Sequence, residues 1–333
     1  MSQAAATPRQ PAPQPEVAAA LRRNFAVIIP ALNESANIPG LFRELEATFR
    51  KHQLQGEVIF VDDGSTDDSL AVAHQEGNKL ARFRVEHHKR NLGKTEALLT
   101  GARAAESDWI VLFDADLQHH PEEIPRLLSE IEKGYDIVCG RKRGKYDKRL
   151  VSGIYNWLSR RLFRVPVRDL NSIKIFRSSV LDEIHLRHDW HRFFVVLAHA
   201  RGYRIGEIDV ELHPRKKGES KYGGKARLFV GLLDLVAVWF LLLFSRKPML
   251  LFGFTGLLLL TAGLAVGITA IVLRMLGHGF RPLLNLVILL GVLGVSLFGF
   301  GFVAEMIAQL RAEVEDLREA ARTGRSDRRE DRS

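Results

Sequence analysis

The chain of 333 residues contains a single cysteine, Cys139. One thiol cannot form an internal disulfide, and it cannot build a cysteine metal site, so both classes of stabilising crosslink are excluded. This is compatible with a reducing compartment. The first twenty residues are rich in Ala, Pro and Gln and lack the apolar segment of a signal peptide. We therefore predict that residues 1–23 form a disordered tail.

Charged residues are absent from two long stretches near the carboxyl end, 248–273 and 282–304. A bilayer is crossed by about 20 apolar residues, so we predict a transmembrane helix in each stretch. The segment 228–244 is also apolar, but Asp234 near its middle would cost roughly 2.5–3.5 kcal/mol to insert. We therefore favour an interfacial amphipathic helix over 224–247 rather than a third span.

Basic residues predict the side of the membrane on which the rest of the chain lies. Arg246 and Lys247 precede the first span, and the charged tail 305–333 contains Arg311 and Arg318. With two spans, the domain and the tail share one side, which the excess of cations identifies as cytoplasmic. We expect a bacterial inner membrane. The tail mixes Glu and Arg at helical spacing and then becomes polar, so we expect its end to be disordered.

The net charge of +9 suits anionic partners such as lipid head groups or phosphates. The basic residues lie next to the apolar segments and no nucleic-acid motif is present. No nucleic-acid partner is therefore predicted, whereas the lipid bilayer is.

Residues 24–223 alternate short apolar runs with amphipathic segments, the pattern of an α/β fold. This pattern predicts a mainly parallel, Rossmann-like sheet covered by helices on both faces. The predicted strands are 26–30, 58–61, 83–86, 109–113 and 137–139, and the predicted helices are 38–51, 67–76, 94–105 and 121–133.

Acidic residues follow three of the predicted strands, as Glu34, Asp62-Asp63 and Asp114-Ala115-Asp116. In parallel sheets, ligands bind beyond the carboxyl ends of the strands, so we expect one shared site. Asp114 and Asp116 can hold a divalent cation against a pyrophosphate, and Gln118 offers another oxygen. The alternative is a solvated acidic loop.

Three further segments have both a binding and a structural interpretation. Asp63 can bond a base or a ribose, or the segment can instead cap the next helix through Ser65 and Asp67. Lys94 opens a helix whose free amides favour an anion, or it ends a plain turn. The basic segment 215–222 can clamp a pyrophosphate or attract an anionic membrane.

As an ordered set, these motifs resemble glycosyltransferase family 2. The matching segments are PALNE at 30–34, VDDGSTDDS at 61–69, NLGK at 91–94, DADLQ at 114–118 and RKKGESKY at 215–222. Within the family, the likeness is greatest to the dolichol-phosphate mannose synthase group and its bacterial polyprenyl-phosphate relatives, over about residues 24–310. It implies a GT-A type fold, a Mg²⁺ or Mn²⁺ ion, and inverting transfer of a sugar from a GDP- or UDP-linked donor to a dolichyl or undecaprenyl phosphate. A homo-oligomer is left open.

The resemblance also implies roles for individual residues. Asp116 and Gln118 match metal ligands with Asp114 close by, and Lys94 and Ala115 fall in the donor site. The remaining matches are Pro30, Leu32, Glu34, Val61 and Asp63 for the nucleoside pocket, and Arg141, Arg215 and Lys221 for the phosphates. Two departures bear on the sugar and the acceptor: Leu32 stands where an aromatic residue is frequent, and Asn-Ser-Ile-Lys at 171–174 replaces a Ser-Gly-Phe type segment.

The chemistry assigns the catalytic roles to Asp116, Asp169, Arg215 and Lys221. A phosphate with a second pKa of about 6 is mostly a dianion and attacks without a base. Asp169 would therefore orient the acceptor or the sugar, or it is a structural partner of Arg168. Arg215 and Lys221 would stabilise the charge on the leaving diphosphate.

Two rival functions remain. A processive polysaccharide synthase shares the donor chemistry but carries a QxxRW motif and more spans, and this sequence has no QxxRW. A non-catalytic membrane binding protein on the same scaffold would not need the acidic motifs.

Overall fold

The computed structural model describes residues 22, 24–143, 165–184, 186, 190–213, 238, 240, 248–278 and 281–330. The chain divides into two compact units, Met1–Leu232 and Leu233–Ser333. The tail 1–23 (apart from residue 22), the basic segment 215–222 and the predicted interfacial helix 224–247 (apart from residues 238 and 240) lie outside the described residues.

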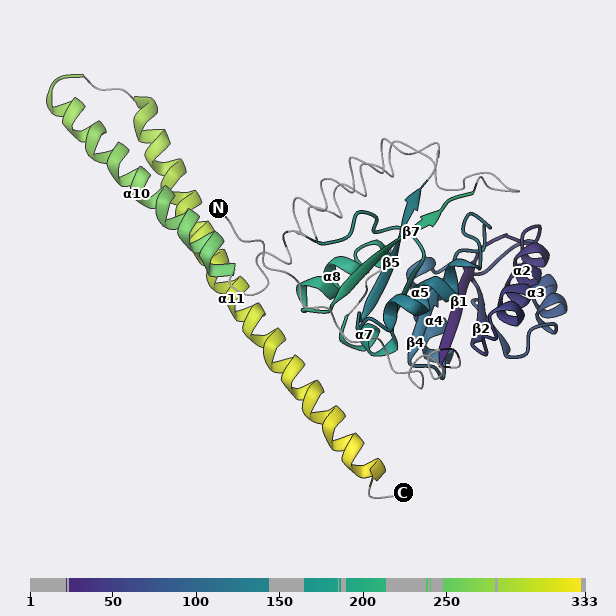
Figure 1. The fold of residues 1–333 in the computed structure, drawn as a ribbon. Coiled ribbons are helices and arrows are strands. Elements are labelled where there is room, and N and C mark those ends of the chain that lie inside the picture. Colours follow the sequence, from purple (N-terminus) through teal and green to yellow (C-terminus); the bar gives the residue numbers. More distant parts are fainter. Residues whose placement is uncertain are drawn as a thin grey trace, which may run out of the picture. The chain divides into compact units, whose positions relative to one another are not determined.

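The first unit is built on a seven-stranded sheet with the order β3-β2-β1-β4-β6-β5-β7 (Figure 1). Of these strands, β6 alone runs antiparallel to its neighbours, β4 and β5. The prediction of a mainly parallel sheet is therefore confirmed. The strands are β1 (Phe25–Ala31), β2 (Glu57–Asp62), β3 (Phe83–His87), β4 (Trp109–Leu112), β5 (Ile137–Arg143), β6 (Lys174–Arg177) and β7 (Ile205–Glu211).

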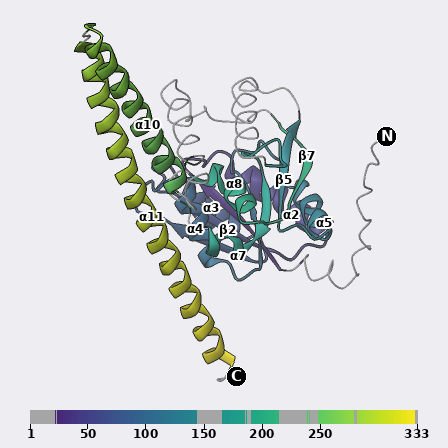
Figure 2. The same cartoon turned by 90° about the vertical axis from the view of Figure 1, so that its left-hand side faces the viewer.

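The central strands are almost entirely apolar because both of their faces are covered, and the exceptions are Glu57 and Asp62 at the two ends of β2. Every residue of β2 and β4 is buried, as are all but Pro30 in β1. One face of β1 packs against α2 (Ile38–Lys51) and α5 (Glu123–Ile131). On the other face, α4 (Lys94–Ala104) approaches so closely that a Cβ on Gly101 would lie 2.5 Å from Ile28. Figure 2 shows the same layers from the side.

Helix α2 illustrates how the sequence pattern produces this packing. Its buried residues recur at helical spacing, which gives one apolar stripe toward the sheet. The predicted bounds of α2 are confirmed. Helix α3 (Ser69–Gly77) begins two residues later than predicted, and α5 begins at Glu123 rather than at residue 121. The remaining helices of the unit are α7 (Ser178–Glu183), η1 (Trp190–Arg192) and α8 (Phe194–Ala200).

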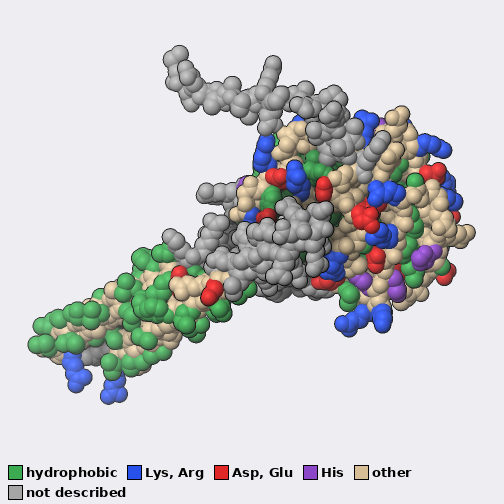
Figure 3. Space-filling view, turned by 90° about the horizontal axis from the view of Figure 1, so that it is seen from below, with side chains coloured by type: hydrophobic (Ala, Val, Ile, Leu, Met, Phe, Trp, Pro, Cys, Tyr) green, Lys and Arg blue, Asp and Glu red, His purple; other side chains and the backbone are tan. Residues whose placement is uncertain are grey.

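The second unit contains an antiparallel pair of helices, α10 (Pro248–Met275) and α11 (Arg281–Glu330). Two stretches, Pro248–Met275 and Arg281–Leu310, are long and apolar enough to cross a bilayer. Hydrophobic side chains cover most of the pair's visible surface in Figure 3. The backbones touch at Gly256, where a Cβ would lie 2.7 Å from the carbonyl oxygen of Gly294. Small residues of this kind permit close helix packing in a membrane.

Helix α11 extends well beyond the predicted second span. The sequence predicts a span over 282–304 followed by a charged tail with a disordered end, whereas the helix continues to Glu330. The Glu and Arg residues after position 305 are good helix formers. Their helical spacing therefore reflects a continuous helix rather than a short helical start.

Candidate active site

The predicted site residues gather at the carboxyl edge of the parallel strands. Glu34 follows β1, Asp63 follows β2, and Asp114 follows β4. Lys174 joins them because β6 runs in the opposite direction and begins at this edge. The shared edge predicted from the sequence is thus present in the fold.

Hydrogen bonds join the loop after β1 to the loop after β2. Asn33 has a positive φ of 54°, and its backbone N–H donates to the Ser65 hydroxyl at 2.9 Å. Its side-chain oxygen accepts the Thr66 N–H at 2.7 Å. The Glu34 N–H donates to the Ser69 hydroxyl at 2.8 Å. Asn33 therefore shapes the turn and helps to join the two loops.

The carboxylate of Asp63 is buried and holds the loop that precedes α4. Its Oδ1 accepts the Leu92 N–H at 2.8 Å, and its Oδ2 accepts the Gly93 N–H at 2.9 Å. The ring of His88 lies 2.8 Å from Oδ1 and also contacts the Thr100 hydroxyl on α4. These contacts join β2, β3 and α4, in addition to the nucleoside contact that the sequence predicts for Asp63.

Replacing Asp63 with asparagine is expected to destabilise the domain. The side-chain amide of the asparagine would direct its own N–H at the backbone N–H of either Leu92 or Gly93, so one hydrogen bond would be lost. A hydrogen bond to a charged group contributes about 1.5–3 kcal/mol to the free energy of unfolding. A loss of about 2 kcal/mol would lower the melting temperature by roughly 4–8 °C. The measurement is thermal unfolding of the full chain in detergent.

The matched control for this change is Asp68→Asn. Asp68 is exposed and its side chain makes no hydrogen bond that caps α3. Asp68→Asn therefore removes the same negative charge without removing a hydrogen bond to the loop before α4. Equal melting temperatures for Asp63→Asn, Asp68→Asn and the unaltered chain would show that Asp63 does not hold the loop.

Asp62 is fully buried beside this network. Its Oδ2 lies 2.8 Å from the ring nitrogen Nδ1 of His87, while its Oδ1 has no hydrogen-bond partner within the described part of the chain. Gly64 follows with φ of 73°, and a Cβ there would lie 2.4 Å from the backbone of Arg90. Glycine is therefore required where the β2 loop meets the β3–α4 loop.

Lys94 and Asp114 form an ion pair between α4 and the end of β4. Burial opposes ionisation of this carboxyl, but the ammonium of Lys94 outweighs it and holds the pKa of Asp114 well below its usual range. Asp114 is therefore an anion throughout the physiological pH range. Lys94 is the first residue of α4, so the free amides of a helix N-terminus add to its positive charge here.

The DADLQ segment turns sharply after Asp116. Leu117 has φ of 56°, which is rare for a residue other than glycine. The Gln118 N–H donates to Asp116 Oδ1 at 3.2 Å. The turn thus places Asp114, Asp116 and Gln118, three oxygen-bearing side chains, on one short segment, and that donor set suits a hard divalent cation.

Sequence reasoning missed two lysines at this edge, which also holds His119. Lys174 is buried and donates to the Leu170 carbonyl at 2.9 Å, and burial lowers its pKa. Lys142 lies 4.0 Å from the carboxylate of Asp169. Burial also lowers the pKa of His119 to about 4, despite the opposing charge of Asp114. The sequence did contain a sign that Lys174 is buried, because this lysine lies inside the apolar run Ile173–Phe176.

Asp169 is buried near these cations. Its Oδ1 accepts the Asn171 N–H at 2.9 Å, and its own N–H donates to Glu207 at 3.2 Å. The ion pair of Asp169 within the described residues is with Lys142 rather than with Arg168. The structural alternative that the sequence suggested therefore names the wrong cation.

Arg141 is predicted to contact phosphate, and it is held by Asp209 across two hydrogen bonds. Arg143 shares the same carboxylate at 2.7 Å. Two cations therefore converge on one anion at the end of β5. Of the other predicted residues, Val61 and Ala115 are buried, Pro30 and Leu32 are half-buried, and Arg215 and Lys221 lie outside the described residues.

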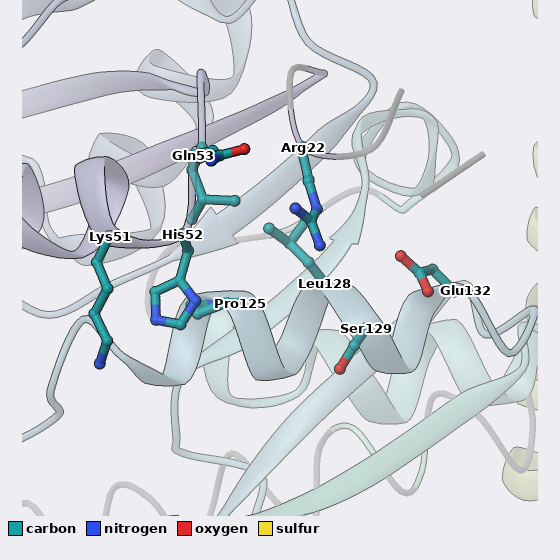
Figure 4. A pocket seen from close by; sticks show the side chains of 9 residues that line it. Arg22, Lys51, His52, Gln53, Pro125, Leu128, Ser129 and Glu132 are labelled. Atoms are coloured by element: carbon teal, nitrogen blue, oxygen red, sulfur yellow. The ribbon is translucent and has the colours of Figure 1, made fainter. Parts of the chain in front are cut away.

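A hollow lies at the opposite edge of the sheet, where Arg22 precedes β1 and Gln53 precedes β2 (Figure 4). It is bordered by Lys51, His52 and the α5 residues Leu128 and Ser129. Ligands of parallel sheets bind at the other edge, beyond the carboxyl ends of the strands. The candidate active site is therefore the acidic edge and not this hollow.

Comparisons with known sequences identify the family of the chain. The model of the family described as glycosyl transferase family 2 matches residues 26–195. The dodecaprenyl-phosphate galacturonate synthase of Rhizobium johnstonii is 33% identical over 86% of this chain and 88% of its own length. The undecaprenyl-phosphate 4-deoxy-4-formamido-L-arabinose transferase of Klebsiella pneumoniae is 29% identical over 88% of this chain and 90% of its own.

Solved structures show the same fold. Glucosyl-3-phosphoglycerate synthase from Mycobacterium tuberculosis, crystallised with Mg²⁺ and UDP, has a TM-score of 0.54 and 22% identity over 67% of this chain and 83% of its own. A complex of that enzyme with Mn²⁺, UDP and glucosyl-3-phosphoglycerate has a TM-score of 0.55 and 21% identity over 71% and 86% of the two chains. The fold is of the GT-A type, and the chain belongs to glycosyl transferase family 2, as a glycosyltransferase.

Proposed function

We propose that this glycosyltransferase moves a sugar from a nucleotide-diphosphate donor to a polyprenyl phosphate, with inversion at the anomeric carbon. An oxygen of the acceptor phosphate attacks that carbon, and the bond to the nucleoside diphosphate breaks. The single observation that carries the proposal is the likeness over 86% of the chain to a dodecaprenyl-phosphate galacturonate synthase. A likeness of this extent reaches beyond residues 26–195, which the family model matches.

The acidic edge supports a divalent cation, Mg²⁺ or Mn²⁺, held by Asp114, Asp116 and Gln118. Among the described residues no group of three His, Cys, Asp or Glu side chains converges. Sites with one or two carboxylates suit a cation that is shared with substrate phosphates. When bound, the cation neutralises negative charge on the departing diphosphate.

The other residues of the edge divide between donor and acceptor. Pro30, Leu32, Glu34, Val61, Asp63 and Ala115 would surround the GDP or UDP moiety. Lys94, at the N-terminus of α4, would face the donor phosphates. The dianionic acceptor needs no base, so Asp169 would orient it. The remaining phosphate contacts would come from Arg141, Arg215 and Lys221.

The membrane module suits an acceptor that cannot leave the bilayer. In this proposal α10 and α11 anchor domain 24–223 and the charged segment 305–333 on the cytoplasmic face of a bacterial inner membrane, with 224–247 lying in the interface. Two apolar helices of sufficient length support the anchoring.

Incubation with radiolabelled donors tests this function. Purified full-length chain receives undecaprenyl phosphate with Mg²⁺ or Mn²⁺ and, in separate reactions, UDP- and GDP-linked hexoses and uronic acids. We expect one donor to give a single lipid product whose mass equals the acceptor plus one sugar, with the anomeric configuration opposite to that of the donor.

Other products would overturn the proposal in different ways. A polymer would identify a polysaccharide synthase. A labelled product in the absence of any lipid acceptor would exclude polyprenyl phosphate as the substrate. No product with any donor, from a chain that still binds the nucleotides, would indicate a binding protein on this scaffold.

A further inference from the structure

The segment 168–172 contains Asp169 and leads into β6 without forming a helix or a strand of its own. Asp169 is only 6% exposed. Backbone N–H and C=O groups that lie near a buried position outside regular structure need side-chain or other partners. The partners of this segment therefore show what fixes the position of Asp169.

Glu207 on β7 binds the backbone at the start of this segment. Its Oε1 accepts the N–H of Asp169 at 3.2 Å, and the same oxygen also accepts the N–H of Arg168. Hydrogen bonds from an N–H group to an ionised carboxylate are roughly twice as strong as those between neutral groups. One oxygen of Glu207 thus holds two consecutive amides, the second of which belongs to Asp169.

Two lysines bind the carbonyl groups of the same segment. The Lys174 ammonium on β6 donates to the Leu170 carbonyl at 2.9 Å, and the Lys142 ammonium on β5 donates to the Asn171 carbonyl. The anion thus meets backbone donors, and the cations meet backbone acceptors. Side chains from three strands, β5, β6 and β7, therefore hold a segment that has no hydrogen-bonding ladder of its own.

The register of the sheet explains why Glu207 and Lys174 reach the same segment. Cys139 on β5 is in register with Glu207 on β7 and with Lys174 on β6. Strands β5 and β7 lie side by side in Figure 1. Residues in register on neighbouring strands place their side chains on the same face of a sheet. Glu207 and Lys174 therefore share one face, on either side of Cys139.

We propose that Glu207 is a positioning residue of the transfer reaction, which holds Asp169 in place through the backbone of segment 168–172. This inference rests on the proposed function, in which Asp169 orients the acceptor phosphate. Glu207 acts on the reaction through Asp169 and not through a contact with the substrate. What matters is therefore the reach of its side chain, which brings one oxygen to the two amides, more than its negative charge.

Two substitutions separate the reach of this side chain from its charge. Glu207→Gln keeps the length and an acceptor oxygen for both amides, whereas Glu207→Asp keeps the charge and withdraws it by about 1.5 Å, one C–C bond. A misplacement of about 1 Å by a change far from the chemistry can slow an enzyme about 10²-fold. We expect Glu207→Asp to lower kcat/KM for undecaprenyl phosphate about 10–100-fold. Glu207→Gln should lower it much less.

The measurements use the full-length chain in detergent, with undecaprenyl phosphate and the donor that gives the lipid product. Calorimetry of UDP and GDP binding without acceptor reports the donor site, and both variants should keep the affinity of the unaltered chain. Melting temperatures show whether each variant folds. The matched control is Glu211→Asp, which shortens an exposed glutamate at the end of the same strand and should leave the rate unchanged.

A double-mutant cycle tests whether Glu207 acts through Asp169. Asp169→Asn removes the orienting carboxylate, after which the position of this side chain should no longer matter. Adding Glu207→Asp to Asp169→Asn should therefore slow turnover by no more than about twofold beyond Asp169→Asn alone. If the two losses multiply instead, Glu207 acts independently of Asp169 and the inference is wrong.

Three other results would overturn the inference while the unaltered chain still makes its lipid product. A slower rate for Glu207→Gln than for Glu207→Asp would show that the charge matters and not the reach, and a large loss in Glu207→Gln would show the same if Glu207→Asp did not fold. An unchanged rate for Asp169→Asn would leave Glu207 nothing to position. A loss of nucleotide affinity equal to the loss of rate would indicate a general structural role. Failure of the unaltered chain to make any lipid product would reject the proposed function, and this inference with it.

Discussion

Replacing Asp116 with asparagine is expected to lower turnover by about 10²–10³-fold, as does removal of one group that stabilises developing charge in other enzymes. The reason is the loss of an anionic oxygen from the proposed cation site. The turn itself should survive, because asparagine keeps the side-chain oxygen that accepts the Gln118 N–H. The measurement is the rate of lipid product formation at saturating donor, together with the melting temperature, which should not change.

The control for this change is Asp108→Asn. Asp108 is exposed, precedes β4 rather than following it, and bonds Asn24 at 2.7 Å. Asp108→Asn therefore also removes one negative charge, but at the opposite edge of the sheet. Chelation by EDTA provides an independent arm, with recovery on adding Mn²⁺ or Mg²⁺. If the enzyme keeps its rate in EDTA, or if both asparagine variants lose activity equally, the metal site is wrong.

Arg215→Ala and Lys221→Ala are each expected to slow turnover about a hundredfold, whereas Lys216→Ala should have little effect. Two explanations for the basic segment predict different outcomes. Attraction to anionic lipid is worth about 1 kcal/mol per basic residue and fades within a Debye length. A contact to charge that develops in a dry site is worth about 2.7–4 kcal/mol, which is roughly a hundredfold or more in rate.

The decisive measurement uses detergent without anionic lipid. The chain carries two helices that can anchor it, so membrane attraction by one lysine should hardly alter the rate. Specific loss at positions 215 and 221 would support a phosphate clamp. Equal losses in all three variants, or losses confined to membranes with anionic lipid, would show that the segment is a membrane patch.

Much of the fold follows from local sequence patterns. Strands β1, β2 and β4 are short, mainly apolar runs, and α2 has one apolar stripe. These strands and this helix are therefore recognisable from the sequence alone. Strand β6 was missed because Lys174 interrupts its apolar run, and the hydrogen bond that its buried ammonium donates to the Leu170 carbonyl is not visible in the sequence. Strand β7 was missed because it lies in a stretch that is otherwise irregular and basic, although its alternation of apolar and acidic residues is that of a half-buried strand.

The gathering of the candidate site residues at one edge of the sheet was predictable, whereas their hydrogen bonds and ion pairs were not. Carboxylates at strand ends converge because parallel strands share an edge, which is a property of the topology. The partner of each carboxylate depends on residues far away in the chain. Asp63 bonds amides about 30 positions later, and Arg141 meets Asp209 after 68 positions. No local pattern records such distances, so the bonds of Asp63 to the loop before α4 were not predicted.

The bonds of Asp63 to Leu92 and Gly93 also have a consequence for donor affinity. They fix the N-terminal end of α4 during folding, so the amides that would meet the donor phosphates are already aligned in the free enzyme. A loop that is ordered beforehand loses little conformational entropy on binding. The conformational entropy of ordering this loop is therefore lost when the domain folds and not when the nucleotide-sugar binds. Donor association at this loop should proceed without a slow ordering step.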